Sequence, residues 1–361
     1  MKAARYYGNH DIRIEDIEQQ QLKPGTARIK IAWCGICGTD LHEYLDGPIF
    51  CPTPNTPSPV AHETAPVTLG YEMSGVISEV GDGIDDLKVG DHVVVEPYVL
   101  HDDVDTSENN DAYHLSKDMN FIGLTGRGGG LSENIVVRRR WIHKIPDSIP
   151  LDEAALIEPL SVAVHAVEQA GITGPTKGFA LVGGAGPIGV LIASVLHAQG
   201  LTVAVTELSE LRRKRALESA HVDYAFDPRE VDVAAQVHEL TDGNGADYMF
   251  EASSADPVLQ TLIDAGAPRS VLVNASIWGH KPTVDLAQVV LKEITIRGTI
   301  AYVNTHPKTI DLVASGKINV KPFITGKINL EDLIDKGFDQ LINHNETAVK
   351  VLVSPNGEGE D

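Results

Sequence analysis

Short apolar runs alternate with longer amphipathic segments through the second half of the chain. Runs of this length favour buried strands, and apolar residues three or four positions apart favour helices. The expected strands are 179–182, 202–206, 247–250, 271–274 and 294–300, and the expected helices are 187–199, 209–219, 231–240 and 257–265. Because strands and helices alternate, this part is predicted to form a doubly wound parallel sheet with right-handed crossovers.

The first half has a different pattern: apolar and polar positions alternate at 28–33 and predict a half-buried strand, and 73–80 and 91–96 predict strands separated by a turn at 81–83. A stretch at 47–66 contains six prolines and predicts an irregular loop. A helix is expected over 151–170, ended by Gly171. Mixed structure returns after Thr305. We therefore expect an α/β protein with domains at 1–155 and 156–300, and a return to the first domain over 301–361.

Composition narrows the class of protein. The formal net charge is −22, from 51 acidic and 29 basic residues, and such a surface repels nucleic acids and anionic membranes. No apolar run is long enough to span a bilayer, and the N-terminal residues lack the apolar core of a secretory signal. The only cysteines are Cys34, Cys37 and Cys51. This sparse, odd count favours a reducing compartment, so we expect a cytoplasmic protein. From the charge and the lack of long apolar runs we expect no membrane or nucleic-acid partners.

A glycine motif follows the strand at 179–182 and predicts a dinucleotide site. Gly184, Gly186 and Gly189 supply G-x-G-x-x-G, and the next helix begins at Pro187 or Ile188. The first glycine allows the tight turn, the second lets the backbone approach the pyrophosphate, and the third lets helix and strand pack closely. The N-terminus of that helix offers N–H groups to the phosphates.

An acidic residue about twenty positions further on completes this fingerprint. Glu207 stands there, at the end of the following strand. A carboxylate at this position accepts hydrogen bonds from the ribose hydroxyls and repels a 2′-phosphate, so NAD(H) is favoured over NADP(H). The nearby Arg212 and Arg213 are basic and weaken that preference.

The segment Cys34-Gly35-Ile36-Cys37-Gly38-Thr39-Asp40-Leu41-His42-Glu43, together with 65–75, 155–165 and the glycine motif, resembles the medium-chain dehydrogenase/reductase superfamily. The closest likeness is to its butanediol and sorbitol dehydrogenase branch, and it extends almost from end to end. The resemblance implies a GroES-like mixed β catalytic domain and a Rossmann coenzyme domain. It also implies Thr39 and His42 as a proton relay, and assembly into homodimers or homotetramers.

In this family a catalytic zinc is held by cysteine, histidine and glutamate. Cys37, Glu72 and Glu158 match ligand positions, but Tyr71 stands where the resemblance implies histidine. Zinc needs three protein ligands and one open position. The three matching residues can supply that number, and tyrosine is a poor ligand because its pKa is near ~10. Whether zinc binds is therefore left open. Without zinc, Tyr71 is a candidate general acid or oxyanion donor beside Thr39.

The structural zinc found in some relatives is not expected. It needs four cysteines after the Glu96-Pro97 segment, and the stretch 98–120 contains none. Histidines and carboxylates in that stretch do not form the closed thiolate site that structural zinc prefers.

Three functions remain open. The first is NAD(H)-dependent interconversion of a small secondary alcohol, diol or hydroxyketone with its carbonyl form, in the manner of alcohol and polyol dehydrogenases. The second is zinc-independent reduction of a conjugated alkene or enone, with Tyr71 as proton donor. The third is a coenzyme-binding protein without turnover. The retained Cys37, Thr39, His42, Glu72 and Glu158 argue against the third.

Overall fold

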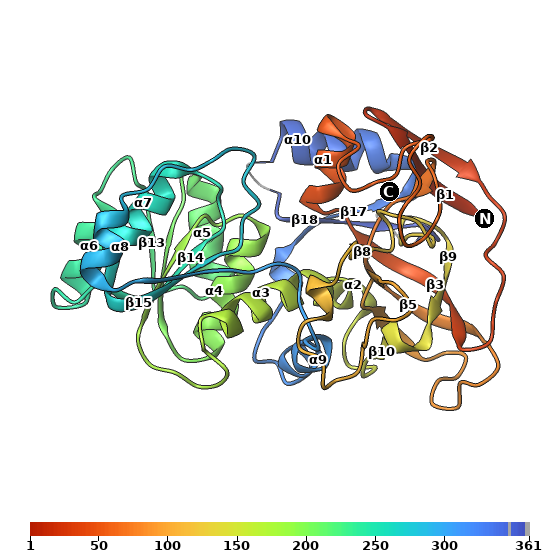
Figure 1. Cartoon of the computed structure of the whole chain (residues 1–361), viewed down its shortest axis with the longest axis horizontal. Coiled ribbons are helices and arrows are strands. Elements are labelled where there is room, and N and C mark those ends of the chain that lie inside the picture. The colour runs from red at the N-terminus through yellow and green to blue at the C-terminus, as the bar shows by residue number, and fades with distance from the viewer. Residues whose placement is uncertain (346–347, 358–361) are drawn as a thin grey trace. The chain divides into compact units, whose positions relative to one another are not determined.

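The computed structural model describes residues 1–345 and 348–357, which divide into two compact units (Figure 1). Unit 1 comprises Met1–Glu158, His306–Ala314 and Val320–Asp361, of which 346–347 and 358–361 lie outside the described residues. Unit 2 comprises Pro159–Thr305 and Ser315–Asn319. None of the helices in the described residues is both long and apolar enough to cross a bilayer.

Unit 1 is built on antiparallel strands. Its main sheet has the order β10-β6-β5-β3-β18-β17, and β9 also pairs with β3. The smaller sheets are β2-β1-β4 and β7-β8. The strands are β1 (Lys2–Gly8), β2 (Asp11–Asp16), β3 (Thr26–Gly35), β4 (Val67–Thr68), β5 (Glu72–Val80), β6 (His92–Val95), β7 (Tyr98–Val99), β8 (Asn120–Phe121), β9 (Asn134–Arg138), β10 (Ile142–Lys144), β17 (Ile324–Asn329) and β18 (Lys350–Ser354).

Strand β18 joins residues from the two ends of the sequence. It runs antiparallel to β3, with Val353 opposite Cys34 and Leu352 opposite Gly35, and parallel to β17. All five of its residues are buried, including Lys350. The helices of this unit are α1 (Gly38–Asp46), α2 (Leu151–Ala154), α9 (His306–Ala314) and α10 (Asp339–Asn343).

Unit 2 contains the predicted parallel sheet. Its strand order is β13-β12-β11-β14-β15-β16, and every pairing in it is parallel. The strands are β11 (Phe179–Gly183), β12 (Thr202–Thr206), β13 (Tyr224–Phe226), β14 (Ala246–Glu251), β15 (Gly266–Asn274) and β16 (Thr295–Gly298). The helices are α3 (Ile157–Gln169), α4 (Pro187–Ala198), α5 (Glu210–Ser219), α6 (Val233–Leu240), α7 (Asp256–Ala265) and α8 (Leu286–Lys292).

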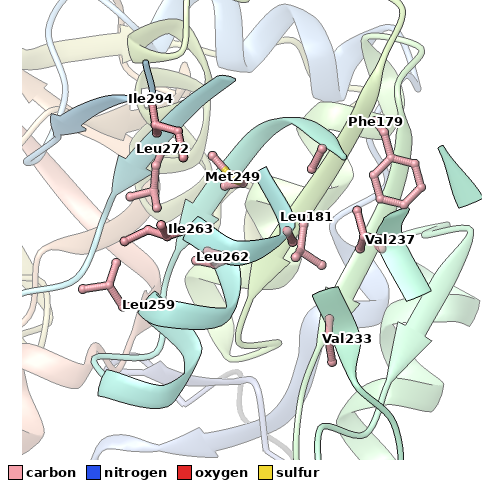
Figure 2. Close-up of a cluster of buried hydrophobic side chains, with 13 residues drawn as sticks. Phe179, Leu181, Val233, Val237, Met249, Leu259, Leu262, Ile263, Leu272 and Ile294 are labelled. Atoms are coloured by element: carbon pink, nitrogen blue, oxygen red, sulfur yellow. The ribbon is translucent and has the colours of Figure 1, made fainter. Parts of the chain in front are cut away.

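The core of unit 2 forms where α6 and α7 meet the sheet. Figure 2 shows Val233 and Val237 of α6 and Leu262 of α7 gathered around Leu181 and Met249. The latter two come from the central strands β11 and β14, and all five side chains are buried. Burying such side chains contributes roughly 1.5–3 kcal/mol each. This packing fixes the carboxyl ends of β11 and β12, where the glycine motif begins.

The helix expected over 151–170 is in fact two helices. Helix α2 ends at Ala154 and α3 begins at Ile157. Pro159 explains the interruption, because proline has no N–H to donate to the carbonyl four residues earlier and fits only in a first helical turn. The break places Glu158 in the first turn of α3, where a negative charge favours the helix dipole. Within unit 2, β13 and α8 were absent from the sequence prediction.

Candidate functional site

The predicted proton relay lies at the beginning of α1. Cys37 is the N-cap residue of this helix, and its backbone N–H donates to the carboxylate of Asp40 at 2.9 Å. The Cys37 Sγ lies 3.9 Å from the Thr39 Oγ1. His42 follows one helical turn after Thr39 and is exposed, with Nδ1 3.9 Å from the carboxylate of Asp46. The helix therefore places a hydroxyl and a solvent-facing imidazole on neighbouring turns.

Tyr71 is buried immediately before β5. Its hydroxyl hydrogen-bonds the Cys37 thiol, and its ring lies 5.3 Å from that of Phe121. Burial is the main reason that the pKa of Tyr71 is well above its usual value, and the nearby acidic groups Cys37 and Asp40 add to the effect when they ionise. The phenol is therefore protonated at neutral pH and acts as a hydrogen-bond donor.

Burial likewise raises the pKa of Cys37 to about 12, so this thiol is protonated at neutral pH in the structure. Asp40 is fully buried, and burial raises its pKa to about 7 despite the hydrogen bond from the Cys37 backbone. Both shifts show a region where negative charge is costly. Zinc supplies positive charge that would offset this cost, as would a lysine or arginine.

A lysine supplies positive charge at this point. The Lys350 Nζ lies 2.6 Å from the Glu72 carboxylate and donates to the carbonyl of Ile36 at 3.1 Å. Burial alone would lower the pKa of Lys350, but the neighbouring acidic groups, with Glu72 the largest contributor, together outweigh it and raise the pKa. Lys350 therefore supplies a counter-charge to Glu72 from within unit 1.

The predicted zinc ligands can now be compared with the needs of the metal. Cys37, Glu72 and Glu158 all belong to unit 1. Within residues 1–345 and 348–357, however, no choice of their ligand atoms brings all three within 4.8 Å of one another. With Glu72 bound to Lys350, this arrangement does not fit a zinc ion held by three protein ligands. The ligand set stays a prediction.

Sequence inspection missed two residues of this region. Lys350 stands alone in the apolar run Ala348-Val349-Lys350-Val351-Leu352-Val353, and a single charge in such a run signals a buried ion pair. Glu43 is the second, for which the sequence predicted no role. Its buried carboxylate accepts hydrogen bonds from the backbone N–H groups of Ile49 and Cys51 at 3.0 and 3.2 Å and also from that of Phe50. It therefore orders the beginning of the proline-rich loop.

The coenzyme motif in unit 2 has the expected glycine geometry. Gly184 has φ +94°, which favours glycine, and a Cβ on Gly189 would lie 2.0 Å from the Gly184 carbonyl oxygen. Gly186 caps α4, and a Cβ built on it meets no atom within 4 Å. Pro187 is the first helical residue and Ile188 the second. The open space at Gly186 and the N–H groups of the helix form a cradle for a phosphate.

Glu207 lies at the end of β12, next to this turn. Its carboxylate accepts hydrogen bonds from the backbone N–H groups of Ala185 and Ser209, both at 2.9 Å. The guanidinium of Arg213 donates to the Glu207 carbonyl at 2.8 Å and lies 3.0 Å from Asp227. The N–H of Arg212 donates to the side chain of Ser209 at 3.4 Å. The Glu207 side chain is thus fixed beside the glycine turn, and the Arg213 guanidinium forms an ion pair with Asp227.

The stretch 98–120 is held by aromatic packing. The Tyr98 ring lies 5.3 Å from that of Tyr113 and 5.5 Å from that of Trp141. The Tyr113 hydroxyl donates to the buried carboxylate of Glu96. The Arg140 Nη1 lies 3.4 Å from the same carboxylate. Its guanidinium therefore faces a buried negative charge.

Comparison with known proteins agrees with the fold. Residues 23–147 match the alcohol dehydrogenase GroES-like domain, and residues 187–315 match the zinc-binding dehydrogenase family. An (R,R)-butanediol dehydrogenase of Neisseria gonorrhoeae is 57% identical over 99% of this chain and 100% of its own length. One from Bacillus subtilis is 42% identical over 99% of this chain and 100% of its own length.

A solved structure shows the same likeness in three dimensions. The 2R,3R-butanediol dehydrogenase from Bacillus subtilis superimposes with a TM-score of 0.91 at 41% identity, covering 98% of this chain and 99% of its own. Unit 1 and unit 2 therefore both have the folds found in known dehydrogenases. The chain belongs to the medium-chain dehydrogenase/reductase superfamily of NAD-dependent oxidoreductases, in the branch of the butanediol and sorbitol dehydrogenases.

Proposed function

We propose that this protein is an NAD(H)-dependent dehydrogenase that interconverts a small vicinal diol with its hydroxyketone. The observation that carries this proposal is the 57% identity, without truncation, to a butanediol dehydrogenase. The second relative at 42% identity has the same activity in its name. These relatives favour diol oxidation over enone reduction and over coenzyme binding without turnover.

The coenzyme is NAD(H), with Gly184, Gly186, Pro187, Ile188 and Gly189 around the pyrophosphate. The Glu207 carboxylate accepts from the ribose hydroxyls and repels a 2′-phosphate. Its hydrogen bonds to Ala185 and Ser209 hold it beside the turn. Arg213 is engaged with Asp227, which leaves its charge partly neutralised and supports NAD(H) over NADP(H).

The proposed reaction transfers one hydride and one proton. In the reductive direction, hydride passes from nicotinamide C4 to the carbonyl carbon, and the carbonyl oxygen takes up a proton to become the alcohol. Tyr71 is a protonated phenol at neutral pH and is suited to donate a hydrogen bond to that oxygen. Thr39 lies beside Cys37 at 3.9 Å and passes the proton on. The exposed His42 exchanges it with solvent.

The partners are a small alcohol or carbonyl substrate and a second copy of the chain. Strand β16 is one of the two edges of the six-stranded sheet, and all four of its residues are exposed. The neighbouring Val290 and Leu291 of α8 are 74% and 77% exposed. An open edge beside apolar side chains is a typical homodimer surface. The three free cysteines suit a reducing compartment such as the cytoplasm.

A substrate panel tests the activity. The purified chain should be assayed with NADH or NADPH against a vicinal diketone, a hydroxyketone, a hexose-derived ketone and a conjugated enone, and with NAD⁺ against each 2,3-butanediol stereoisomer. Fastest turnover with the hydroxyketone–diol pair and NAD(H) is the expected result. Reduction of the enone without diol oxidation would overturn the proposal and select the alternative with Tyr71 as proton donor.

A further inference from the structure

Two histidines and a buried glutamate meet within unit 1, apart from the residues discussed for catalysis. Glu96 directly follows β6, His143 is the central residue of β10, and His306 is the first residue of α9. One ligand atom from each side chain lies within 4.8 Å of those from the other two. They come from three separate parts of the sequence, so no local motif reveals them.

The backbone places these side chains. Strands β10 and β6 pair with Ile142 opposite Val95, and the Glu96 N–H donates to the Trp141 carbonyl at 2.8 Å. This brings the His143 Nε2 to 2.7 Å from the Glu96 Oε2. The ring of His306 stacks on that of His143, with centroids 5.0 Å apart and planes 25° apart.

Burial makes the cluster a distinct chemical environment. Glu96 and His306 are completely buried, and the His143 side chain is 16% exposed. Burial opposes ionisation of Glu96, but the hydrogen bonds from His143 and Tyr113 and the two nearby imidazoles together outweigh it and lower the pKa to about 2. Burial lowers the pKa of His306 to about 3. At neutral pH the cluster therefore holds a carboxylate and at least one neutral imidazole.

We propose that Glu96, His143 and His306 bind one divalent transition-metal ion of the zinc class. Two imidazole nitrogens and one carboxylate oxygen form a donor set that zinc accepts, with a fourth position for water. Imidazole ligands disfavour Mg²⁺ and Ca²⁺, which prefer oxygen alone. This site is separate from the predicted ligands Cys37, Glu72 and Glu158.

Two other groups contact Glu96 and must accommodate the ion. The Tyr113 hydroxyl donates to the Oε1, which leaves the Oε2 as the ligand atom. The Arg140 Nη1 lies 3.4 Å from that Oε2 and gives way when the ion binds. Its guanidinium stays anchored by the Thr106 carbonyl, 2.7 Å from Nε, and by the Trp141 ring, whose centroid is 4.6 Å away.

Binding of the metal ion also displaces a proton from the cluster. The hydrogen bond between His143 and Glu96 is replaced by two bonds to the ion, and Nε2 must then carry no proton. Stacking on the ring of His143 holds the second imidazole ring in place. Fixing a ligand ring through its other contacts is the usual way in which proteins support a metal site.

An ion at this point would join β6, β10 and α9. Helix α9 lies between the two segments of the chain that belong to unit 2, Pro159–Thr305 and Ser315–Asn319. We expect the ion to hold this short returning segment against the sheet of unit 1. Binding to the folded state alone raises stability with metal concentration.

Co²⁺ titration of the chelator-treated full chain tests the proposal. We expect visible d–d bands that saturate at one ion per chain, and a melting temperature that rises when Zn²⁺ is added. His306→Phe and His143→Asn each remove a ligand and should weaken binding by at least the roughly 10–100-fold that loss of an outer-shell partner costs, with far-UV circular dichroism unchanged. His344→Asn, at an exposed histidine, is the matched control and should bind as the natural chain does.

Cys37→Ser separates this site from the predicted catalytic zinc site. Saturation that persists in Cys37→Ser, without a thiolate-to-cobalt charge-transfer band, supports the proposal. Absence of Co²⁺ binding by the natural chain would overturn it, and so would binding that is lost in Cys37→Ser and unchanged in both histidine variants. If His306→Phe fails to fold, His143→Asn alone carries the comparison, because its side chain is partly exposed.

Discussion

The Lys350 ammonium lies 2.6 Å from the Glu72 carboxylate, and both side chains are buried in unit 1. Removing one member of a buried pair leaves an uncompensated charge. Lys350→Met is expected to lower the free energy of unfolding by about 3–5 kcal/mol, measured by urea denaturation. The double variant Lys350→Met/Glu72→Gln should recover much of that loss.

The matched control for this pair is Lys336→Met. Lys336 forms an ion pair with Asp332 at 3.2 Å, but its side chain is 57% exposed, so the change should cost about 1 kcal/mol at most. If both lysine variants lose the same free energy of unfolding, the buried pair contributes no more to stability than the exposed one.

Tyr71 is expected to affect turnover more than coenzyme binding. Tyr71→Phe removes the hydroxyl without changing the ring that packs on Phe121. Loss of a general acid typically costs about 10²–10⁴ in rate, so kcat for hydroxyketone reduction should fall while the Kd for NADH stays unchanged. Stopped-flow reduction and fluorescence titration measure these separately. Tyr7→Phe, at a partly exposed tyrosine bonded to Glu15, is the control, and a similar rate in both variants would contradict the assignment.

Glu207 should set the choice of coenzyme. Glu207→Ser removes the carboxylate beside the glycine turn, and losing a charged hydrogen bond costs about 1.5–3 kcal/mol. The Kd for NADH should therefore rise by about tenfold or more, and discrimination against NADPH should shrink. Isothermal titration with both coenzymes measures the two effects. Glu210→Gln, exposed in the first turn of α5, should leave them unchanged.

The exposed surface of α8 predicts self-association. Val290→Glu and Leu291→Glu place charges on side chains that are 74% and 77% exposed, so the folded monomer should tolerate them while a homodimer dissociates. Light scattering after size exclusion gives the mass directly. Leu211→Glu, on α5 and 48% exposed, is the control. An unchanged mass in all three variants would place the interface elsewhere.

Asp227 predicts a specific acid sensitivity. Its hydrogen bonds from Arg229, at 2.6 and 2.9 Å, lower the pKa of this carboxyl. Because the pKa is lower in the folded state, the stabilisation is present above the usual Asp value and is lost as the pH falls below it. Asp227→Asn should reduce stability at pH 7 and flatten its decline in acid. Asp242→Asn, in an exposed turn with φ 53°, should keep the natural pH profile.

Features that depend on residues close together in the sequence were predicted correctly. The glycine turn, Glu207 at the end of β12, and the boundaries of β12 and α4 all follow from local spacing. Lys350 was missed because its partner Glu72 is 278 positions away. The cluster of Glu96, His143 and His306 was missed because β-sheet register and α9 bring it together. The break before α3 was missed because the apolar periodicity continues across it, although Pro159 marked it.

The order in which the chain is synthesised also matters for unit 1. Strand β3 is made early, yet its edge at Cys34 and Gly35 pairs with β18, which begins at Lys350. A ribosome must therefore produce nearly the whole polypeptide before Glu72 gains its counter-charge. Unit 2 has most of its residues in one continuous stretch, Pro159–Thr305, and can complete its parallel sheet sooner. Until then the nascent first unit carries an open strand edge, a natural binding target for chaperones.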